Sequence, residues 1–278
     1  MKIKSYCKIN LSLRVLRKLN NNLHDIESNN VMVNVFDEIK LVKTNKTKDL
    51  VSFKGKFKEF INPKKNTVVE TLYLLRKFKL IKNFYKIEIK KNIPVFSGLG
   101  GGTGNSVSII KHLLKKGLKK EFINFFENRI GSDFRILSIN QSFQKRLKKV
   151  YPYKKKFKFW FILIFPNIKC STKKIYSLVK KYNKPSRISF HTIKTKKKFI
   201  NYLIEEKNDL QKISSKKYFG IKTLLDFISN QKGCVLSRMT GSGSACFGLF
   251  KTHKLAKLAL KQANKSYPKH WCVVTKTI

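Results

Sequence analysis

The sequence predicts an α+β protein with two domains, and three observations support this fold class. Apolar and polar residues alternate from Ile3 to Val15, as in a strand with one buried face. Apolar residues recur at helical spacing from Asn66 to Phe78. The chain has 278 residues, enough for two domains of roughly 150 residues each. We predict domains at 1–152 and 153–278, because a lysine-rich stretch and Pro152 separate the two halves.

Strands and helices are mixed along the N-terminal domain. Apolar, strand-like segments lie within Val31–Val42, and alternation returns at Phe84–Ile89. Helices are predicted from about Thr103 to Leu114 and from Lys120 to Ile130. Gly131 ends the second helix, since glycine is favoured just after a helix.

The C-terminal domain is predicted to combine strands with helices in the same way. The run Phe157–Phe165 is short, bulky and mostly apolar, as in a buried strand. Helices are predicted near Lys173–Tyr182, Lys197–Glu206, Ile221–Ser229 and Lys254–Asn264, and strands at Ala245–Phe250 and Trp271–Thr275.

The chain is strongly basic, with 62 Lys and Arg against 15 Asp and Glu and a net charge of +47. Such a surplus is typical of proteins that bind nucleic acid or anionic membranes. The basic residues are nevertheless spread along the whole chain, and Lys, Asn, Ile and Phe are over-used together, which indicates compositional drift. We therefore expect solvated lysine-rich faces that attract anionic small molecules, and we do not expect a nucleic-acid partner.

Cysteine usage and hydropathy predict a cytoplasmic protein. The five cysteines are scattered without metal-ligand spacing, so neither a disulfide framework nor a metal site is expected. Lysines interrupt the first residues, where a signal peptide needs an apolar core. The longest apolar run, Phe159–Phe165, is far shorter than the about 20 residues of a membrane span. We expect a monomer or homodimer without a membrane anchor.

A glycine-rich loop, Pro94–Gly104, lies between a predicted strand and a predicted helix. Consecutive glycines let backbone N–H groups approach an anion, and the start of the helix adds positive partial charge. No Gly-Lys-Ser/Thr closes the loop, so it is not a Walker loop. A flexible linker or tight turn is the alternative, and the strand-loop-helix order favours a phosphate site.

The loop resembles the second signature of the GHMP kinases, P-x-x-x-G-L-G-G-G-[ST]. Ser5–Leu11 resembles the family's N-terminal signature and Met239–Ala245 its C-terminal glycine loop. Within the family, Lys8-Ile9-Asn10, His24, Gly131-Ser132-Asp133 and the strand at Trp271 most resemble the kinases of 4-diphosphocytidyl-2-C-methyl-D-erythritol in isoprenoid precursor synthesis. The resemblance implies an N-terminal α/β domain with the phosphate loop, a C-terminal ferredoxin-like domain, and ATP and substrate in the cleft between them.

The resemblance also implies the reaction, in which the γ-phosphoryl of ATP passes to the 2-hydroxyl of the substrate. Mg²⁺ is expected to bridge the phosphates, and the sequence nominates no protein ligand for the ion. Lys8 and Asp133 match the catalytic pair. Asp133 would accept the hydroxyl proton, and Lys8 would keep it ionised and stabilise the transferring group. The alternatives are a helix cap for Asp133 and a solvated lysine for Lys8.

Two further sets of residues match binding positions of the family. The ATP-binding set is Lys91, Pro94, Val95, Phe96, Ser97, Gly98, Leu99, Gly100, Gly101, Gly102, Thr103 and Gly104. The substrate-binding set is Asn10, His24, Thr172, Tyr176, Thr240, Gly241, Ser242 and Gly243. In the resemblance, His24 faces the cytosine and Tyr176 stacks on it. Ordinary structural roles for the histidine and the tyrosine, and a hairpin turn at the second glycine loop, are the alternatives.

Several positions depart from the family pattern. Leu23 stands where an aromatic residue usually precedes the histidine, Phe96 and Ser97 replace glycines, and Gly104 replaces a hydroxyl residue. Two other functions stay open at this point. One is another GHMP kinase acting on mevalonate-like or homoserine-like substrates, and the other is a catalytically decayed basic RNA-binding protein that keeps the fold.

Overall fold

The computed structural model describes residues 2–186 and 192–278. The chain forms two compact units, each drawn from discontinuous segments. Unit 1 consists of the residues up to Cys7, Val35–Val95 and Gly100–Ser138, and unit 2 consists of Lys8–Asn34, Phe96–Leu99 and Ile139–Ile278. The predicted domain boundary near residue 152 stays a prediction.

Two long strands, β1 (Lys2–Lys18) and β2 (His24–Thr44), contribute residues to both units. In unit 1, β2 pairs antiparallel with β4 (Phe84–Lys90), and β4 pairs parallel with β3 (Leu50–Lys54). The predicted strands at Ile3–Val15, Val31–Val42 and Phe84–Ile89 all lie within these elements. The sequence analysis did not predict β3.

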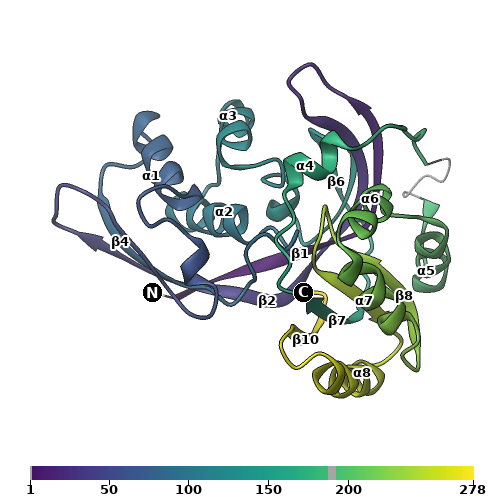
Figure 1. Cartoon of the computed structure of the whole chain (residues 1–278). Helices are drawn as coiled ribbons and strands as arrows, with labels where there is room; N and C mark the ends of the chain where they lie inside the picture. The colour runs from purple at the N-terminus through teal and green to yellow at the C-terminus, as the bar shows by residue number, and fades with distance from the viewer. Residues whose placement is uncertain (1, 187–191) are drawn as a thin grey trace. The chain divides into compact units, whose positions relative to one another are not determined.

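Unit 1 also contains three helices (Figure 1). They are α1 (Thr67–Lys77), α2 (Gly101–Leu113) and α3 (Lys120–Ile130), with short 3-10 turns η1 (Lys58–Phe60) and η2 (Ile136–Ser138). Asn66 starts α1 because its side chain accepts hydrogen bonds from the Val68 and Val69 amides. Gly131 ends α3 at φ 146°, as predicted. Apolar side chains of α1 and α2, including Leu72 and Ile109, pack on Ile39 and Ile87 of the sheet.

A lysine-rich hairpin in unit 2 consists of β5 (Gln141–Arg146) and β6 (Lys149–Pro152), and β5 pairs antiparallel with β2. No strand was predicted in this stretch. The polar side chains of β5 hid the strand, because Gln141, Ser142 and Gln144 are buried there in place of apolar residues.

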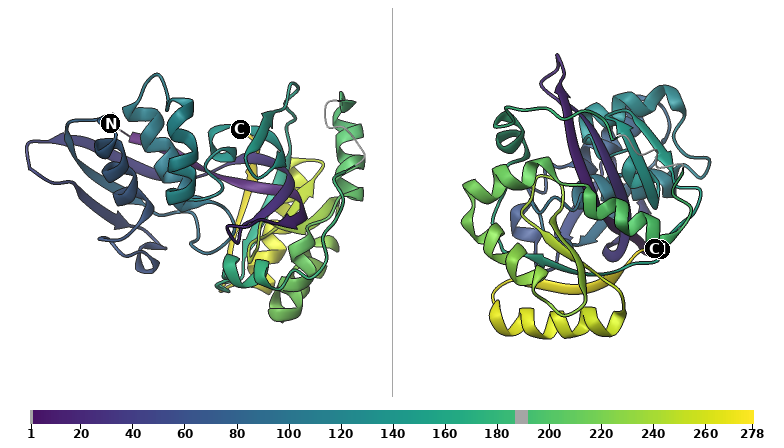
Figure 2. Two further views of the ribbon diagram at one scale, coloured as in Figure 1. Left: turned by 90° about the horizontal axis from the view of Figure 1, so that it is seen from above. Right: turned by 90° about the vertical axis from the view of Figure 1, so that its right-hand side faces the viewer.

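The second sheet of unit 2 is antiparallel, in the order β10-β7-β9-β8. Its strands are β7 (Trp160–Phe165), β8 (Cys234–Met239), β9 (Cys246–Phe250) and β10 (Trp271–Lys276), and α7 (Phe219–Ser229) and α8 (His253–Ser266) connect them. Both helices pack on the sheet through a shared apolar core, and α8 runs alongside it (Figure 2). This β-α-β-β-α-β order is the ferredoxin-like arrangement that was predicted.

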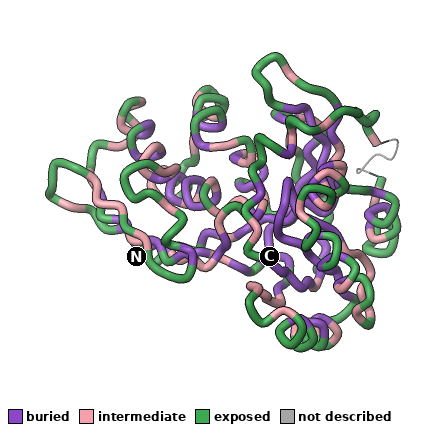
Figure 3. The backbone as a smooth tube through the Cα atoms, in the orientation of Figure 1, coloured by how far each residue is buried: buried purple, intermediate pink, exposed green. Residues whose placement is uncertain are grey.

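Three shorter helices complete unit 2: α4 (Thr172–Ser177), α5 (Lys196–Glu205) and α6 (Asp209–Lys217). The helix expected at Lys173–Tyr182 ends early, at Ser177. The sequence analysis missed β8 and α6, and α6 has only two apolar side chains. Strand segments of both units are largely buried, whereas the outer faces of the helices are exposed (Figure 3). No helix of the described residues is long and apolar enough to cross a membrane.

Candidate active site

A buried polar row on β1 and β2 holds the ammonium group of Lys8, which is 3% exposed. Lys8 Nζ donates a short hydrogen bond to Asn10 Oδ1. Asn10 Nδ2 donates in turn to Ser28 Oγ at 3.0 Å and to Asn30 Oδ1 at 2.7 Å. With both amide hydrogens engaged, the Asn10 side chain has a defined orientation and presents its oxygen to Lys8. The cation is therefore held in a fixed place.

Two glycine loops meet within unit 2. Gly98 of the first loop adopts φ 79°, and a Cβ there would lie 2.5 Å from the Thr240 carbonyl oxygen and 3.1 Å from that of Gly243. A side chain at this position would clash with backbone, so only glycine fits. The Ala245 amide donates to the Ser97 carbonyl at 3.1 Å and joins the loops further.

The second of these loops, Thr240–Gly243, also lies against Lys8. A Cβ on Gly241, whose φ is 57°, would lie 3.3 Å from Asn10 Oδ1 and 3.4 Å from Lys8 Nζ. The Asn10 amide donates to Thr240 Oγ1 at 3.0 Å. Parts of all three sequence motifs thus come together in unit 2, around one buried cation. A cation beside two glycine loops is an arrangement suited to phosphate oxygens.

Three aromatic rings form a group near the start of β2. The ring centroid of His24 lies 5.0 Å from that of Tyr176 and 6.2 Å from that of Tyr182. Burial, and secondarily the charge of Lys18, lowers the pKa of His24, so its imidazole is neutral at neutral pH. Tyr182 is 44% exposed. The group offers flat apolar surface beside a neutral hydrogen-bonding ring.

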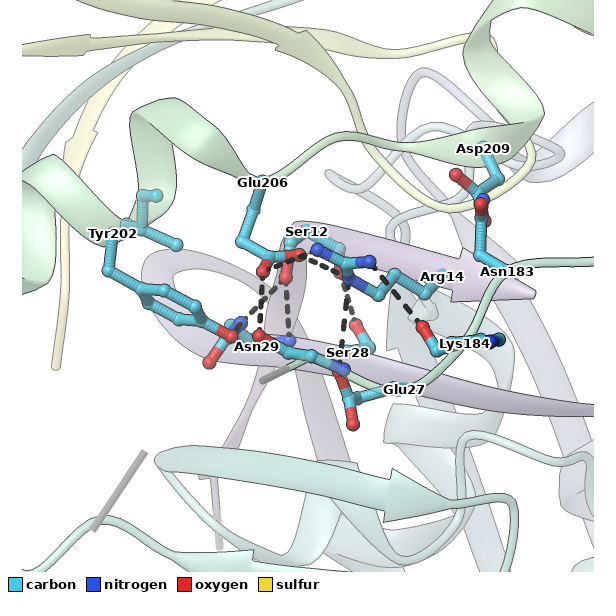
Figure 4. A network of polar contacts seen from close by, with 12 residues as sticks. Ser12, Arg14, Glu27, Ser28, Asn29, Asn183, Lys184, Tyr202, Glu206 and Asp209 are labelled. Carbon is cyan, nitrogen blue, oxygen red and sulfur yellow. Dashed lines mark hydrogen bonds and ion pairs between the residues drawn. The ribbon is translucent and has the colours of Figure 1, made fainter. Parts of the chain in front are cut away.

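The chain that follows Tyr182 is fixed to β1 and β2 by an acid-rich network (Figure 4). Asp209 accepts from the Val15 amide at 2.7 Å and from Asn183 Nδ2 at 2.8 Å. The Ser186 amide donates to Glu27 at 2.9 Å. Because both ends of Asn183–Ser186 are tied in this way, the segment that follows Tyr182 is held against β1 and β2.

Arg14 and Glu206 form the centre of the same network. Arg14 Nε and Nη2 donate to the two carboxylate oxygens of Glu206 at 2.7 and 2.9 Å. The hydrogen bond to Glu206 is the main reason why the pKa of Arg14 is raised. Burial raises the pKa of the neighbouring Glu27. A two-point pair of this kind also fixes the orientation of the arginine.

The start of α2 in unit 1 is the predicted phosphate end of the glycine loop. Gly100 precedes the helix at φ 74°, and the amide of Gly104 makes an intrahelical bond to its carbonyl at 2.8 Å. The first amides of the helix, from Gly101 on, have no partner within the helix and carry its positive partial charge. These amides are the groups that bind anions at helix starts.

Lys91 lies next to this helix start. Its ammonium is 2% exposed and forms a short ion pair with the fully buried Asp37. Asp37 also accepts from the amides of Asn92 and Ile93 at 2.8 and 2.9 Å. A Cβ on Gly101 would lie 3.4 Å from Lys91 Nζ. The ion pair is therefore buried next to Gly101. The role of Lys91 in binding ATP stays a prediction.

Asp133 lies just after α3 in unit 1, half-buried, and its carbonyl accepts from the Leu137 amide at 3.0 Å. Gly131 links this turn to the helix start, because a Cβ there would lie 2.7 Å from Thr103 Oγ1. Phe134 and Ile136, which follow Asp133, are buried in the core. Lys8 belongs to unit 2, so the predicted catalytic pair draws one residue from each unit.

Known proteins share both the motifs and the fold. Residues 66–131 match the family model of the GHMP kinases N terminal domain, and residues 195–269 match that of the GHMP kinases C terminal. The chain is 36% identical, over 100% of its length and 99% of the relative's, to a 4-diphosphocytidyl-2-C-methyl-D-erythritol kinase of Pelagibacter ubique. The chain belongs to the GHMP kinase family.

Solved structures agree with this family fold. A 4-(cytidine 5'-diphospho)-2C-methyl-D-erythritol kinase is similar to this GHMP kinase at a TM-score of 0.76 and 18% identity, over 99% of both chains. A homoserine kinase from Cytophaga hutchinsonii is similar at a TM-score of 0.69 and 16% identity, over 100% of this chain and 94% of the other. At such identities the similarity shows the fold alone.

Most predicted substrate residues of this GHMP kinase lie together in unit 2. Asn10 binds Lys8, and the Asn10 amide donates to Thr240 Oγ1. A Cβ on Gly241 would lie 3.4 Å from Lys8 Nζ, and Thr172 reaches the same loop through a hydrogen bond of 2.9 Å with Ser242 Oγ. The predicted ATP residues are divided, since Pro94, Val95 and Gly100–Gly104 belong to unit 1 and Phe96–Leu99 to unit 2.

Sequence reasoning missed four residues that position this site. Ser28 and Asn30 hold Asn10, Asn208 contacts the second glycine loop, and Tyr182 accompanies His24. Asn208 carried a detectable signal, because Asn-Asp before a segment that ends in Lys-Lys indicates a helix start. The other three come close to the site only through the fold.

Proposed function

We propose that the protein is a 4-diphosphocytidyl-2-C-methyl-D-erythritol kinase that transfers the γ-phosphoryl of ATP to the 2-hydroxyl, in the cytoplasm, for isoprenoid precursor synthesis. The aromatic group of His24, Tyr176 and Tyr182 is the observation that carries this proposal, because it suits a flat base and lies in the same unit as Lys8 and the second glycine loop. The relative from Pelagibacter ubique bears this name and matches the chain over its full length, which supports the same substrate.

In the proposed reaction, Lys8 and Asp133 have different roles. The substrate 2-hydroxyl oxygen bonds to the γ-phosphorus as the bond to the β-phosphate oxygen breaks, and ADP leaves. Asp133 accepts the hydroxyl proton. Lys8, held by Asn10, stabilises negative charge on the transferring phosphoryl oxygens.

The start of α2 receives the phosphates of ATP in this proposal, through the amides from Gly101 onward. Among the described residues, no cluster of three His, Cys, Asp or Glu side chains is suited to hold a metal ion. Mg²⁺ in kinase sites keeps several waters and binds chiefly to phosphates with one or two carboxylates. That mode of binding fits this chain, and the ion would neutralise phosphate charge.

Replacing Lys8 by Met is expected to lower kcat by about 10²–10³-fold, because the transferring phosphoryl loses a preorganised positive charge. Steady-state kinetics with saturating ATP measures this effect. Lys2→Met, on the same strand and exposed, is the matched control and should leave kcat unchanged. A Lys8→Met variant that folds and keeps the parent kcat would remove Lys8 from the reaction.

Replacing Tyr182 by Ala is expected to raise KM for the diphosphocytidyl substrate about 5- to 100-fold, since loss of a base-stacking ring costs about 1–3 kcal/mol. KM for ATP should not change. Tyr182→Phe retains the ring and should behave as the parent protein. Tyr151→Ala removes another exposed tyrosine of unit 2 and serves as the control. Equal changes in both KM values would contradict a role at the base.

A comparison of acceptors tests the function itself. Purified protein is incubated with ATP, Mg²⁺ and, separately, 4-diphosphocytidyl-2-C-methyl-D-erythritol, mevalonate and homoserine, and ADP release is followed. We expect turnover with the first acceptor alone. Preferred turnover of mevalonate or homoserine would assign a different GHMP kinase activity, and no turnover with any acceptor would contradict the proposal.

A further inference from the structure

The second glycine loop, Thr240–Gly243, rests on the start of helix α6 through one buried side chain. Asn208 is 5% exposed, and its Nδ2 donates to the carbonyl oxygens of Met239 at 2.8 Å and Gly241 at 2.9 Å. Its Oδ1 accepts from the Leu210 amide at 3.0 Å and so caps α6. Both polar atoms of this amide are therefore used: the nitrogen binds the last residue of β8 and the loop, and the oxygen binds the helix.

The same residue is also fixed relative to β1, the strand that carries Lys8. The Leu13 amide donates to the Lys207 carbonyl at 2.9 Å, and Leu13 and Asn208 form a parallel bridge. The neighbours Glu206 and Asp209 bind Arg14 and the Val15 amide in the network of Figure 4. Four consecutive residues, Glu206–Asp209, thus bind both β1 and the glycine loop.

A second contact from α6 acts on the next loop residue. Ser214 Oγ donates to the Ser242 carbonyl at 3.1 Å, and Ser214 is fully buried. The loop position matters because Gly241 leaves no room for a side chain beside Lys8: a Cβ there would lie 3.4 Å from Lys8 Nζ and 3.3 Å from Asn10 Oδ1. A shift of Gly241 would open space beside the ammonium and loosen its position.

We propose that Asn208 is a positioning residue for phosphoryl transfer, which holds Gly241 against Lys8 and keeps the ammonium aligned with the transferring group. This role rests on the proposed kinase activity. It adds to that proposal a residue that the sequence motifs do not contain. Misplacement of a catalytic group by about 1 Å can cost about 10²-fold in rate, so a support of this kind has a measurable effect.

Asn208→Asp separates the loop contacts from the helix cap. The carboxylate still accepts from the Leu210 amide, because Asp caps helices as well as Asn does. It cannot donate to the two carbonyls and repels them instead. We expect kcat to fall about 10- to 100-fold while KM for ATP stays within about 3-fold, the split that a misaligned Lys8 produces. Gln231→Glu, which removes an amide donor to the Phe227 carbonyl, is the matched control and should leave kcat unchanged.

Amide hydrogen exchange gives a readout that needs no substrate. In Asn208→Asp, peptides covering Met239–Ala245 should exchange at least about 10-fold faster than in the parent protein, while peptides covering the core of α8 should not change. If Asn208→Asp does not fold, Asn208→Ser retains a capping oxygen and takes its place.

The two readouts keep the failure of this inference distinct from that of the proposed function. Loop exchange equal to the parent protein, or a fall in kcat no larger than the loss of folded protein, would overturn the role of Asn208. A parent protein that turns over no acceptor would overturn the proposed function, and loop exchange would still decide whether Asn208 holds the loop.

Discussion

Asp133→Asn is expected to lower kcat by about 10²–10⁴-fold, the usual contribution of a positioned general base. Asparagine has the same shape but cannot accept the hydroxyl proton. The fold should be retained, because asparagine fills the same volume and the main-chain carbonyl of residue 133 still accepts from the Leu137 amide. Single-turnover measurement of phosphoryl transfer, with ATP and substrate both bound, isolates the chemical step.

The matched control for this variant is Asp226→Asn, since Asp226 is exposed on α7. It should retain the parent rate. Far-UV circular dichroism of Asp133→Asn should match that of the parent protein and shows that the variant folds. A single-turnover rate within about 3-fold of the parent would show that Asp133 is not the base, whatever its place in the motif.

Asp37→Asn is expected to lower the free energy of unfolding by about 3–5 kcal/mol, because it leaves the buried Lys91 ammonium without its carboxylate. The change also disturbs the acceptor of the Asn92 and Ile93 amides, just before the glycine loop. Urea denaturation measures the loss. We expect Asp37→Leu combined with Lys91→Met to recover most of it, since replacing both charges removes the uncompensated one.

A neighbouring exposed pair supplies the control for this experiment. Glu38 and Lys90 lie 3.3 Å apart next to the buried pair in sequence, with side chains 40% and 48% exposed. Glu38→Gln should leave the urea midpoint nearly unchanged, because water screens exposed pairs. An equally small effect of Asp37→Asn would contradict a structural role for the buried ion pair beneath the glycine loop.

Periodicity predicted the elements whose buried faces are apolar. β1 and α1 were found because Ile9, Leu11 and Leu72 repeat at strand or helix spacing and are fully buried. β5 was missed for the opposite reason. Three of its four buried residues are polar, and two of these, Gln141 and Gln144, use their amides to bind the Phe157 and Leu147 carbonyls at 3.0 Å. Such a strand has no hydrophobic alternation to detect.

For the site as well, the sequence predicted short motifs but not the contacts between distant residues. A phosphate site at the first glycine loop could be proposed from the sequence, because close backbone approach to an anion needs glycine in a short motif. Lys8 was proposed only through the resemblance of Ser5–Leu11 to the family signature. The contacts that fix them come from distant parts of the chain. Asn208 lies 33 residues from Gly241, and Asn30 lies 20 from Asn10. A single sequence does not show that such amides face each other.

The departures from the family pattern also have structural explanations in part. Gly104, which replaces a hydroxyl residue, packs where a Cβ would lie 3.3 Å from Ser5 Oγ and from the Tyr6 carbonyl. Leu23 is 39% exposed, and Tyr182 is the additional ring beside His24. Phe96 adopts φ 59°, a conformation that favours glycine, and nothing in the structure explains its presence there.

Phosphorus NMR of the reaction mixture tests most directly whether this protein phosphorylates the 2-hydroxyl of 4-diphosphocytidyl-2-C-methyl-D-erythritol. Carbon 2 bears the methyl group and has no hydrogen, so a phosphomonoester there gives a resonance without three-bond coupling to a proton. We predict one such uncoupled resonance, formed in step with ADP, while the diphosphate signals of the substrate persist. A proton-coupled phosphomonoester, or ADP without any new ester, would contradict the proposed reaction.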